Sequence, residues 1–136
     1  MSARQTWLAA LQVALREAVA RDFAGALLID DYADRLPNWA PRPGQCHAQV
    51  ARWIAAHPDD HAVRGWLADG EGSGLQRFVA HSLVRTARGA LLDVAFPTPA
   101  YPQIFIPHPA AAGDFLALVH GEPPLPWIDI PLPERS

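Results

Sequence analysis

The distribution of proline is the feature that most limits what this chain of 136 residues can fold into. Proline lacks a backbone N–H, so it interrupts helices and is confined to the edges of sheets. Of the 14 prolines, five lie at positions 97–109 and five more at positions 123–133. After Phe96 we therefore expect only short edge strands such as 103–106, a short helix over 110–120, and an extended tail over 122–136 that wraps the surface.

Two amphipathic helices are predicted before the strands. Apolar residues recur at helical spacing over residues 4–20, and again from Cys46 to about Ala56, where Pro58 stops the second helix. The intervening residues 30–44 combine aspartates, prolines and a glycine, which is typical of a loop. The second helix therefore begins at the single cysteine of the sequence.

Three strands are predicted after the second helix, from apolar runs at residues 62–67, 75–85 and 90–96. The glycine-rich segment 69–74 is expected to be a flexible connection. Residues 86–89 are expected to form a tight turn, with Gly89 at a positive φ angle.

The predicted fold class is α+β. The helix that carries Cys46 packs on a small antiparallel sheet, with an extra N-terminal helix and a proline-rich C-terminal wrap. The length fits a single domain over residues 1–136. Within it we expect an N-terminal helix and loop (1–43), a core (44–96) and a proline-rich C-terminal segment with a short helix (97–136).

Composition excludes several classes of protein. One cysteine leaves no internal disulfide framework and no cysteine-rich zinc cage, and a formal net charge of -3 gives no basic field for nucleic acid. The sequence contains neither a membrane-spanning apolar run nor the apolar core of a signal peptide, so we expect no membrane partner and a cytoplasmic location. Arginine without lysine suggests a bacterial source, and the 50% hydrophobic content is compatible with a homodimer.

Cys46 is a candidate nucleophile because of its place at a helix start. The unpaired N–H groups and the positive end of the helix dipole favour a thiolate there. The preceding Gly44 allows the backbone to turn tightly and leaves access to the sulfur. The other interpretation of Cys46 is a buried structural cysteine, which is a common fate of a free thiol.

His81 and Asp93 are polar residues in the middle of apolar strands, where each needs a partner. Paired residues of a hairpin have a constant index sum. A three-residue turn makes that sum even and places His81 and Asp93 on the same face, whereas a four-residue turn would separate them. Because Gly89 suits a three-residue turn, we expect Asp93 to orient His81 and His81 to activate Cys46.

The order of these residues resembles the transglutaminase-like branch of the papain-like cysteine enzymes. The matching segments span residues 44–96 and are Gly44-Gln45-Cys46, Val63-Arg64-Gly65, His81 and Leu92-Asp93-Val94. The resemblance implies that Cys46 is the nucleophile, His81 the base and Asp93 the orienting acid. It also implies a thiol-dependent acyl-transfer enzyme: an amide or ester hydrolase, a deamidase or a transglutaminase-like transferase. The substrate would be a peptide, a protein or a small amide or ester, with no cofactor or metal required.

The sequence departs from this family at two points. Leu83 stands two positions after the histidine, where the family often has an aromatic residue, and the long insertions of the crosslinking enzymes are missing. Hydrolysis or deamidation is therefore favoured over protein crosslinking. The alternative function is a non-catalytic protein-binding module on the same scaffold, with the proline-rich tail and the acidic loop as its surface.

Several neighbouring residues have more than one interpretation. The backbone N–H of Cys46 is the natural oxyanion donor, while Gln45, Asn38 and Trp39 are side-chain candidates that turn formation or packing also explains. Trp66 either lines an acyl-binding cleft or packs in the core. Two alternative metal sites are possible, one from His57 and His61 and one from Cys46, His47 and His81. Pro58 disfavours the first because it interrupts a helix between the two histidines, and the second lacks a fourth ligand.

Overall fold

The computed structural model describes residues 1–134 and has an α+β fold. Its strand order is β1-β4-β3-β2-β5, with β6 also paired to β3. The chain packs as two compact units. The first comprises residues 1–27, 65–80 and the chain after Gln103, and the second comprises residues 28–64 and 81–103. The long strands β2 (His61–Gly72) and β3 (Leu75–Arg85) each contribute to both units, so the units do not follow the three predicted segments.

The first unit is built around helix α1 (Ala3–Ala20), which matches the predicted helix. Ser2 caps it through a reciprocal pair of hydrogen bonds with Gln5, which satisfies N–H groups of the first turn. Its buried leucines enter a core with β2, β3, β6 and helix α3 (Phe115–Val119). The largest fully buried members of this core are Leu11, Leu15, Trp66, Phe78, Leu118 and Ile130.

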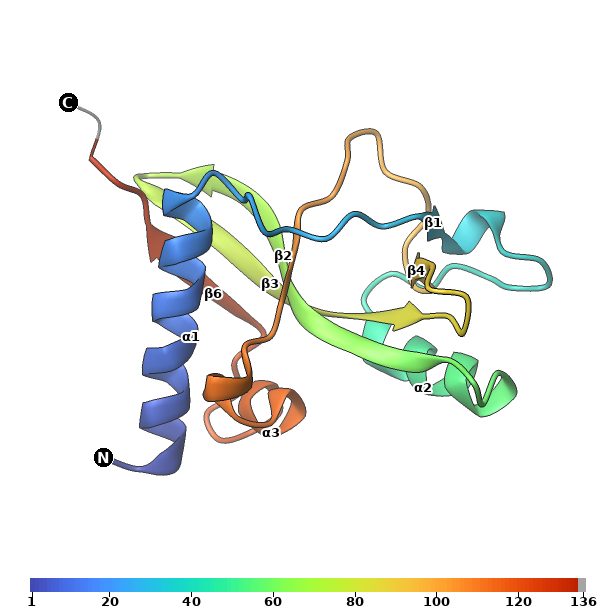
Figure 1. The fold of residues 1–136 in the computed structure, drawn as a ribbon, viewed down its shortest axis with the longest axis horizontal. Helices are drawn as coiled ribbons and strands as arrows, with labels where there is room; N and C mark the ends of the chain where they lie inside the picture. Colours follow the sequence, from blue (N-terminus) through green and yellow to red (C-terminus); the bar gives the residue numbers. More distant parts are fainter. Residues whose placement is uncertain (135–136) are drawn as a thin grey trace. The chain divides into compact units, whose positions relative to one another are not determined.

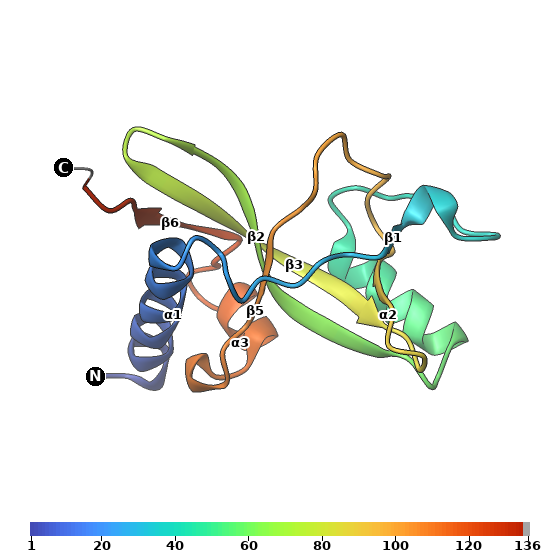
Figure 2. The same cartoon turned by 45° about the horizontal axis from the view of Figure 1, so that its top comes forward.

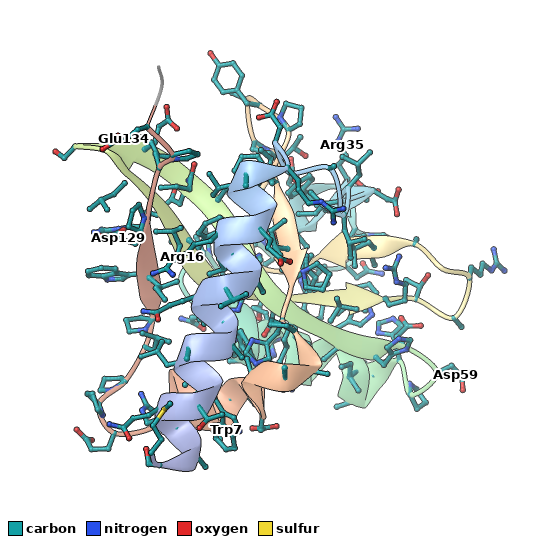
Figure 3. All side chains as sticks on the ribbon, turned by 60° about the vertical axis from the view of Figure 1, so that its left-hand side comes forward. Trp7, Arg16, Arg35, Asp59, Asp129 and Glu134 are labelled. Atoms are coloured by element: carbon teal, nitrogen blue, oxygen red, sulfur yellow. The ribbon has the colours of Figure 1, made fainter. Side chains whose placement is uncertain are left out.

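The predicted helix over 110–120 is confirmed only over α3, because the chain breaks it at Gly113. A short 3₁₀ helix, η2 (Ala110–Ala112), ends there, and Asp114 caps the start of α3. Gly113 has φ 71°, and a Cβ at this position would overlap the indole ring of Trp7. Figure 3 labels Trp7 on α1 next to this segment. The close packing of α1 therefore requires a glycine here.

The C-terminal tail is extended, as predicted, but it is a strand of the sheet rather than a surface wrap. Strand β6 (Trp127–Pro131) pairs antiparallel with β3 from Leu75 to Val79. The alternate residues Ile128 and Ile130 point into the core, and the nearby prolines do not prevent this strand from forming. Residues 135 and 136 of the predicted tail lie outside the described residues. The edge strand expected near 103–106 is β5 (Phe105–Pro107), which pairs antiparallel with β2.

The second unit contains helix α2 (Cys46–Ala56), whose bounds agree with the sequence prediction. Val50 and Trp53 on α2 pack against Val84 of β3 and against residues of strand β4 (Leu91–Asp93) and the chain just after it. Figures 1 and 2 both show α2 beside the C-terminal half of β3. The Cys-bearing helix therefore packs on the sheet as expected.

The sheet is mixed, which corrects the prediction of an antiparallel one. Strand β1 (Asp31–Tyr32) pairs parallel with β4, and the 3₁₀ helix η1 (Ala33–Arg35) follows it directly. Both elements lie inside the predicted loop 30–44. Two residues are too few to give a periodic pattern, so the sequence contains no signal for β1.

The glycine-rich segment 69–74 is not a flexible connection. Strand β2 continues to Gly72, and Ser73 and Gly74 have φ angles of 54° and 76°. Two consecutive positive φ angles form the two-residue turn whose twist matches a hairpin. The polar cluster is therefore the tip of a long hairpin. Along residues 1–134, no helix combines the length and the apolar composition needed to cross a membrane.

Substitution of Gly65 by alanine is expected to destabilise the first unit. A Cβ at Gly65 would overlap the carbonyl oxygen of Ile106 and the ring of Phe105 across the pairing of β2 with β5. We expect the free energy of unfolding, measured by denaturant titration, to fall by about 1–3 kcal/mol. Gly72→Ala is the control in the same strand, since its Cβ would meet nothing within 4 Å. Equal stability of the two variants would contradict the close contact.

Candidate active site

The loop before α2 fixes the position of Cys46. Gly44 has φ 84°, a conformation that favours glycine, and the Gln45 N–H donates to the Arg42 carbonyl oxygen at 3.2 Å. This turn delivers Cys46 as the first residue of the helix. N–H groups in the first turn of a helix have no intrahelical partner, so the sulfur lies beside donors and the positive end of the dipole.

Two side-chain donors, one from the loop and one from α2, bind the chain that follows β4. The Trp39 indole N–H donates to the Val94 carbonyl oxygen at 2.7 Å. The side-chain amide of Gln49, which is 1% exposed, donates to both Val94 and the Ala40 carbonyl oxygen, at 3.1 and 3.0 Å. The helix start is therefore held at a fixed place relative to Asp93, the residue before Val94.

His81 and Asp93 lie on one face of the β3–β4 hairpin, as the index-sum argument predicted. Val84 pairs with Leu92 and Arg85 with Leu91, so residues 87–89 form the three-residue turn, with Gly89 at φ 90°. The His81 Nε2 and the Asp93 Oδ2 are 2.8 Å apart. Their residues are 1% and 0% exposed, so this is a fully buried pair.

Asp93 also ends strand β4, which is shorter than the predicted 90–96. Its Oδ1 accepts hydrogen bonds from the N–H groups of Ala95 and Phe96, both at 2.9 Å. These bonds turn the chain away from β3 and bring the Phe96 ring parallel to the His81 imidazole, with centroids 4.9 Å apart. One carboxylate oxygen thus binds the backbone and the other binds His81.

The sulfur of Cys46 interacts with two imidazoles, those of His47 and His81. Burial alone would raise the pKa of the Cys46 thiol, but hydrogen bonds and charge from these two histidines lower it to about 6. Burial would likewise lower the pKa of His81, but its bonds to Asp93 and Cys46 raise it to about 9. Between these two values the thiolate and the imidazolium are both charged, and the nucleophile is ionised at neutral pH.

The sequence does not predict two contacts of this site, that of His47 with the thiol and that of Ser82 with His47. The His47 Nδ1 lies 3.7 Å from the Cys46 Sγ and 2.6 Å from the Oγ of Ser82. The sequence presents His47 only as an alternative metal ligand. Its position next to the cysteine was the one available signal, and nothing in the sequence indicated that Ser82 would bind it.

The structure settles several of the other candidates. The Trp39 N–H is bound to Val94 and its ring packs edge-on against Trp53 at 5.0 Å, so Trp39 has a packing role. Asn38 adopts φ 56° and forms a turn. Trp66 is fully buried in the first unit and donates to His108, so it belongs to the core rather than to a cleft at Cys46.

The residues of the two alternative metal sites do not form a metal-binding group. Among the described residues, no group of three or more His, Cys, Asp or Glu side chains is arranged to hold a metal ion. His57 stacks on Trp53 at 4.0 Å, and its Nδ1 bonds to the Trp53 carbonyl oxygen. That ring is therefore directed back onto its own helix.

Comparison with known proteins adds no family to this geometry. No family model matches the chain, and no curated protein or solved structure is significantly similar to it.

The ionisation of Cys46 can be measured directly because it is the only cysteine. We expect the ultraviolet absorbance of the thiolate to appear with a midpoint near pH 6, and to be lost as the pH falls below that value. An unperturbed thiol would titrate near about pH 8.5. The Cys46→Ser variant provides the background. A midpoint at or above the ordinary value would contradict the thiolate–imidazolium pair.

Proposed function

We propose that this protein is a thiol-dependent acyl-transfer enzyme in which Cys46, His81 and Asp93 form the catalytic triad. The observation that carries the proposal is the buried 2.8 Å bond between His81 and Asp93, in a site where His81 also lowers the pKa of the single thiol at a helix start. This arrangement combines a nucleophile, a base and an orienting acid.

The reaction follows from the charges of the resting site. The Cys46 thiolate attacks the carbonyl carbon of an amide or ester and forms a C–S bond. The protonated His81 gives its proton to the leaving nitrogen or oxygen as the C–N or C–O bond breaks, leaving a thioester. Water or an amine then attacks the thioester, His81 accepts its proton, and the C–S bond breaks to restore the thiolate.

The oxyanion of each tetrahedral intermediate needs hydrogen-bond donors. The backbone N–H of Cys46 is the first candidate, since it lies in the first helical turn. Gln45 precedes it and makes no side-chain capping bond to the helix. Its amide is thus the side-chain candidate that remains after Trp39 and Asn38 are assigned to packing and turn formation.

The second unit would then be a reduced form of the transglutaminase-like core. Support comes from the order of its elements: a helix that starts at Cys46, a strand that carries His81, and a next strand that ends at Asp93. Gly65, which the resemblance included, is explained by close packing on β5. The substrate would be a peptide, a protein or a small amide or ester. A free thiol nucleophile suits a reducing compartment, so we propose the cytoplasm.

The alternative is a protein-binding module without catalysis. Its support is the exposure of Cys46, which is only 9%. A substrate carbonyl must reach that sulfur for the catalytic proposal to hold. Labelling with iodoacetamide therefore separates the two proposals: a catalytic thiol reacts faster at neutral pH than a free-cysteine peptide, and a buried structural thiol does not.

The activity is expected to depend on all three residues. Amide, ester and glutamine substrates should be turned over with a bell-shaped pH profile, rising near pH 6 and falling near pH 9, because only the thiolate–imidazolium pair is active. Cys46→Ser and His81→Ala should each lower kcat by about 10²–10⁴-fold. Release of ammonia, acid or amine measures the rate.

Asp93→Asn is the sharpest variant of the triad because it preserves the fold. The asparagine oxygen can still accept from the Ala95 and Phe96 N–H groups, so its NH₂ group faces the His81 Nε2. That amide donates to Nε2 and leaves the imidazole proton on the nitrogen that faces Cys46, where it blocks proton transfer from the thiol. We expect kcat to fall by about 10²–10⁴-fold in protein that remains folded, with some loss of unfolding free energy because the charge of Asp93 no longer favours the His81 imidazolium. An Asp93→Asn variant as active as the wild type would refute the orienting role.

A further inference from the structure

The site contains a second imidazole that the triad does not use. His47 follows Cys46 in α2, and its side chain is half-buried at the helix start. Its Nδ1 lies 3.7 Å from the Cys46 sulfur and 2.6 Å from the Ser82 hydroxyl oxygen, and the tautomer of the ring decides which atom donates. A proton on Nδ1 can therefore be donated toward either the sulfur or the hydroxyl.

Ser82 fixes the direction of this ring. Its residue is fully buried, and it lies next to His81 on β3, within the part of the strand that belongs to the second unit. The 2.6 Å bond to the hydroxyl is short, and it comes from a rigid strand rather than from a loop. The hydroxyl therefore orients the imidazole beside the sulfur.

We propose that His47, oriented by Ser82, is a second positioning residue that shares with His81 the stabilisation of the Cys46 thiolate. Each histidine approaches the sulfur from a different element, His47 from α2 and His81 from β3. The two contributions can be measured separately because Asp93 binds the His81 ring, whereas Ser82 binds the His47 ring. The inference deepens the proposed function, but the ionisation of the thiol can be measured whether or not the protein is an enzyme.

The surrounding charges support separate roles for the two histidines. The charged groups that act on the Cys46 sulfur are His47 and His81, and the carboxylate of Asp93 acts on His81. On β1, burial and the charge of Asp93 raise the pKa of Tyr32 to about 12, so the Tyr32 phenol stays neutral over the working range. Asp93 therefore favours a positive charge on His81 without competition from Tyr32, while the His47 ring is held by the hydroxyl of Ser82.

The division has a consequence for the reaction. Sulfur must become an anion both in the resting site and again when the C–S bond of the thioester breaks. In that second step His81 is occupied by the proton taken from water or from the amine. A second donor oriented toward the sulfur makes the thiolate a better leaving group at that moment.

The test is a set of thiol titrations on the full chain. We expect His47→Ala and His81→Ala each to raise the midpoint of thiolate formation by about one pH unit or more. The double variant should titrate near about pH 8.5, as an ordinary cysteine does. His47→Asn keeps an uncharged donor near the position of Nδ1 and should recover part of the shift. Ser82→Ala should produce a smaller shift in the same direction.

His61→Ala is the matched control, because His61 belongs to the same unit but is exposed at the start of β2. A midpoint unchanged by both His47→Ala and Ser82→Ala would overturn the proposal, since His81 would then act alone. If His47→Ala does not fold, Ser82→Ala tests the same contact from β3. Failure of the proposed function gives a different result, namely a low thiol midpoint that depends on both histidines with no turnover of any acyl substrate.

Discussion

The hydrogen bond between His81 and Asp93 is the interaction on which the rest of this site depends. Asp93 uses its two carboxylate oxygens for different tasks: Oδ2 bonds to the imidazole, and Oδ1 accepts two backbone N–H groups that end β4. The same residue thus sets the ring orientation and the path of the chain toward Phe96. The stacking of Phe96 on His81 follows from that path and covers the face of the imidazole.

Cys46 experiences two opposing effects, and their balance decides whether it can react. Burial disfavours the thiolate, while two imidazoles and the helix start favour it, and the net result is a pKa of about 6. The balance depends on position, because the effect of a charge falls quickly with distance. The contacts of Trp39 and Gln49 with Val94 therefore also bear on the pKa of Cys46, since they fix the helix start relative to the strand that carries Asp93.

The parts of this structure that could be predicted are those that a local pattern determines. The spacing of apolar residues predicts α1 and α2, and the parity of a three-residue turn predicts that His81 and Asp93 lie on one face. The failures have a common cause in pairing or packing that sequence patterns do not encode. Strand β6 depends on pairing with a strand about 50 residues away in the chain. Gly113 is required because the Trp7 ring packs against it, and Ser82 contacts His47 only in the folded chain.

The burial of the ion pair itself bears on function. An aspartate and a histidine at 0% and 1% exposure lose their hydration, and a buried pair of this kind contributes little net stability compared with apolar residues of the same size. The surrounding strands are apolar and could accommodate such residues, as Leu83 and Leu91 show on the same face. Stability alone therefore does not explain a buried His81–Asp93 pair beside the only thiol of the chain. The pair has a further effect on that thiol, because Asp93 favours the His81 imidazolium and the imidazolium helps to lower the pKa of Cys46.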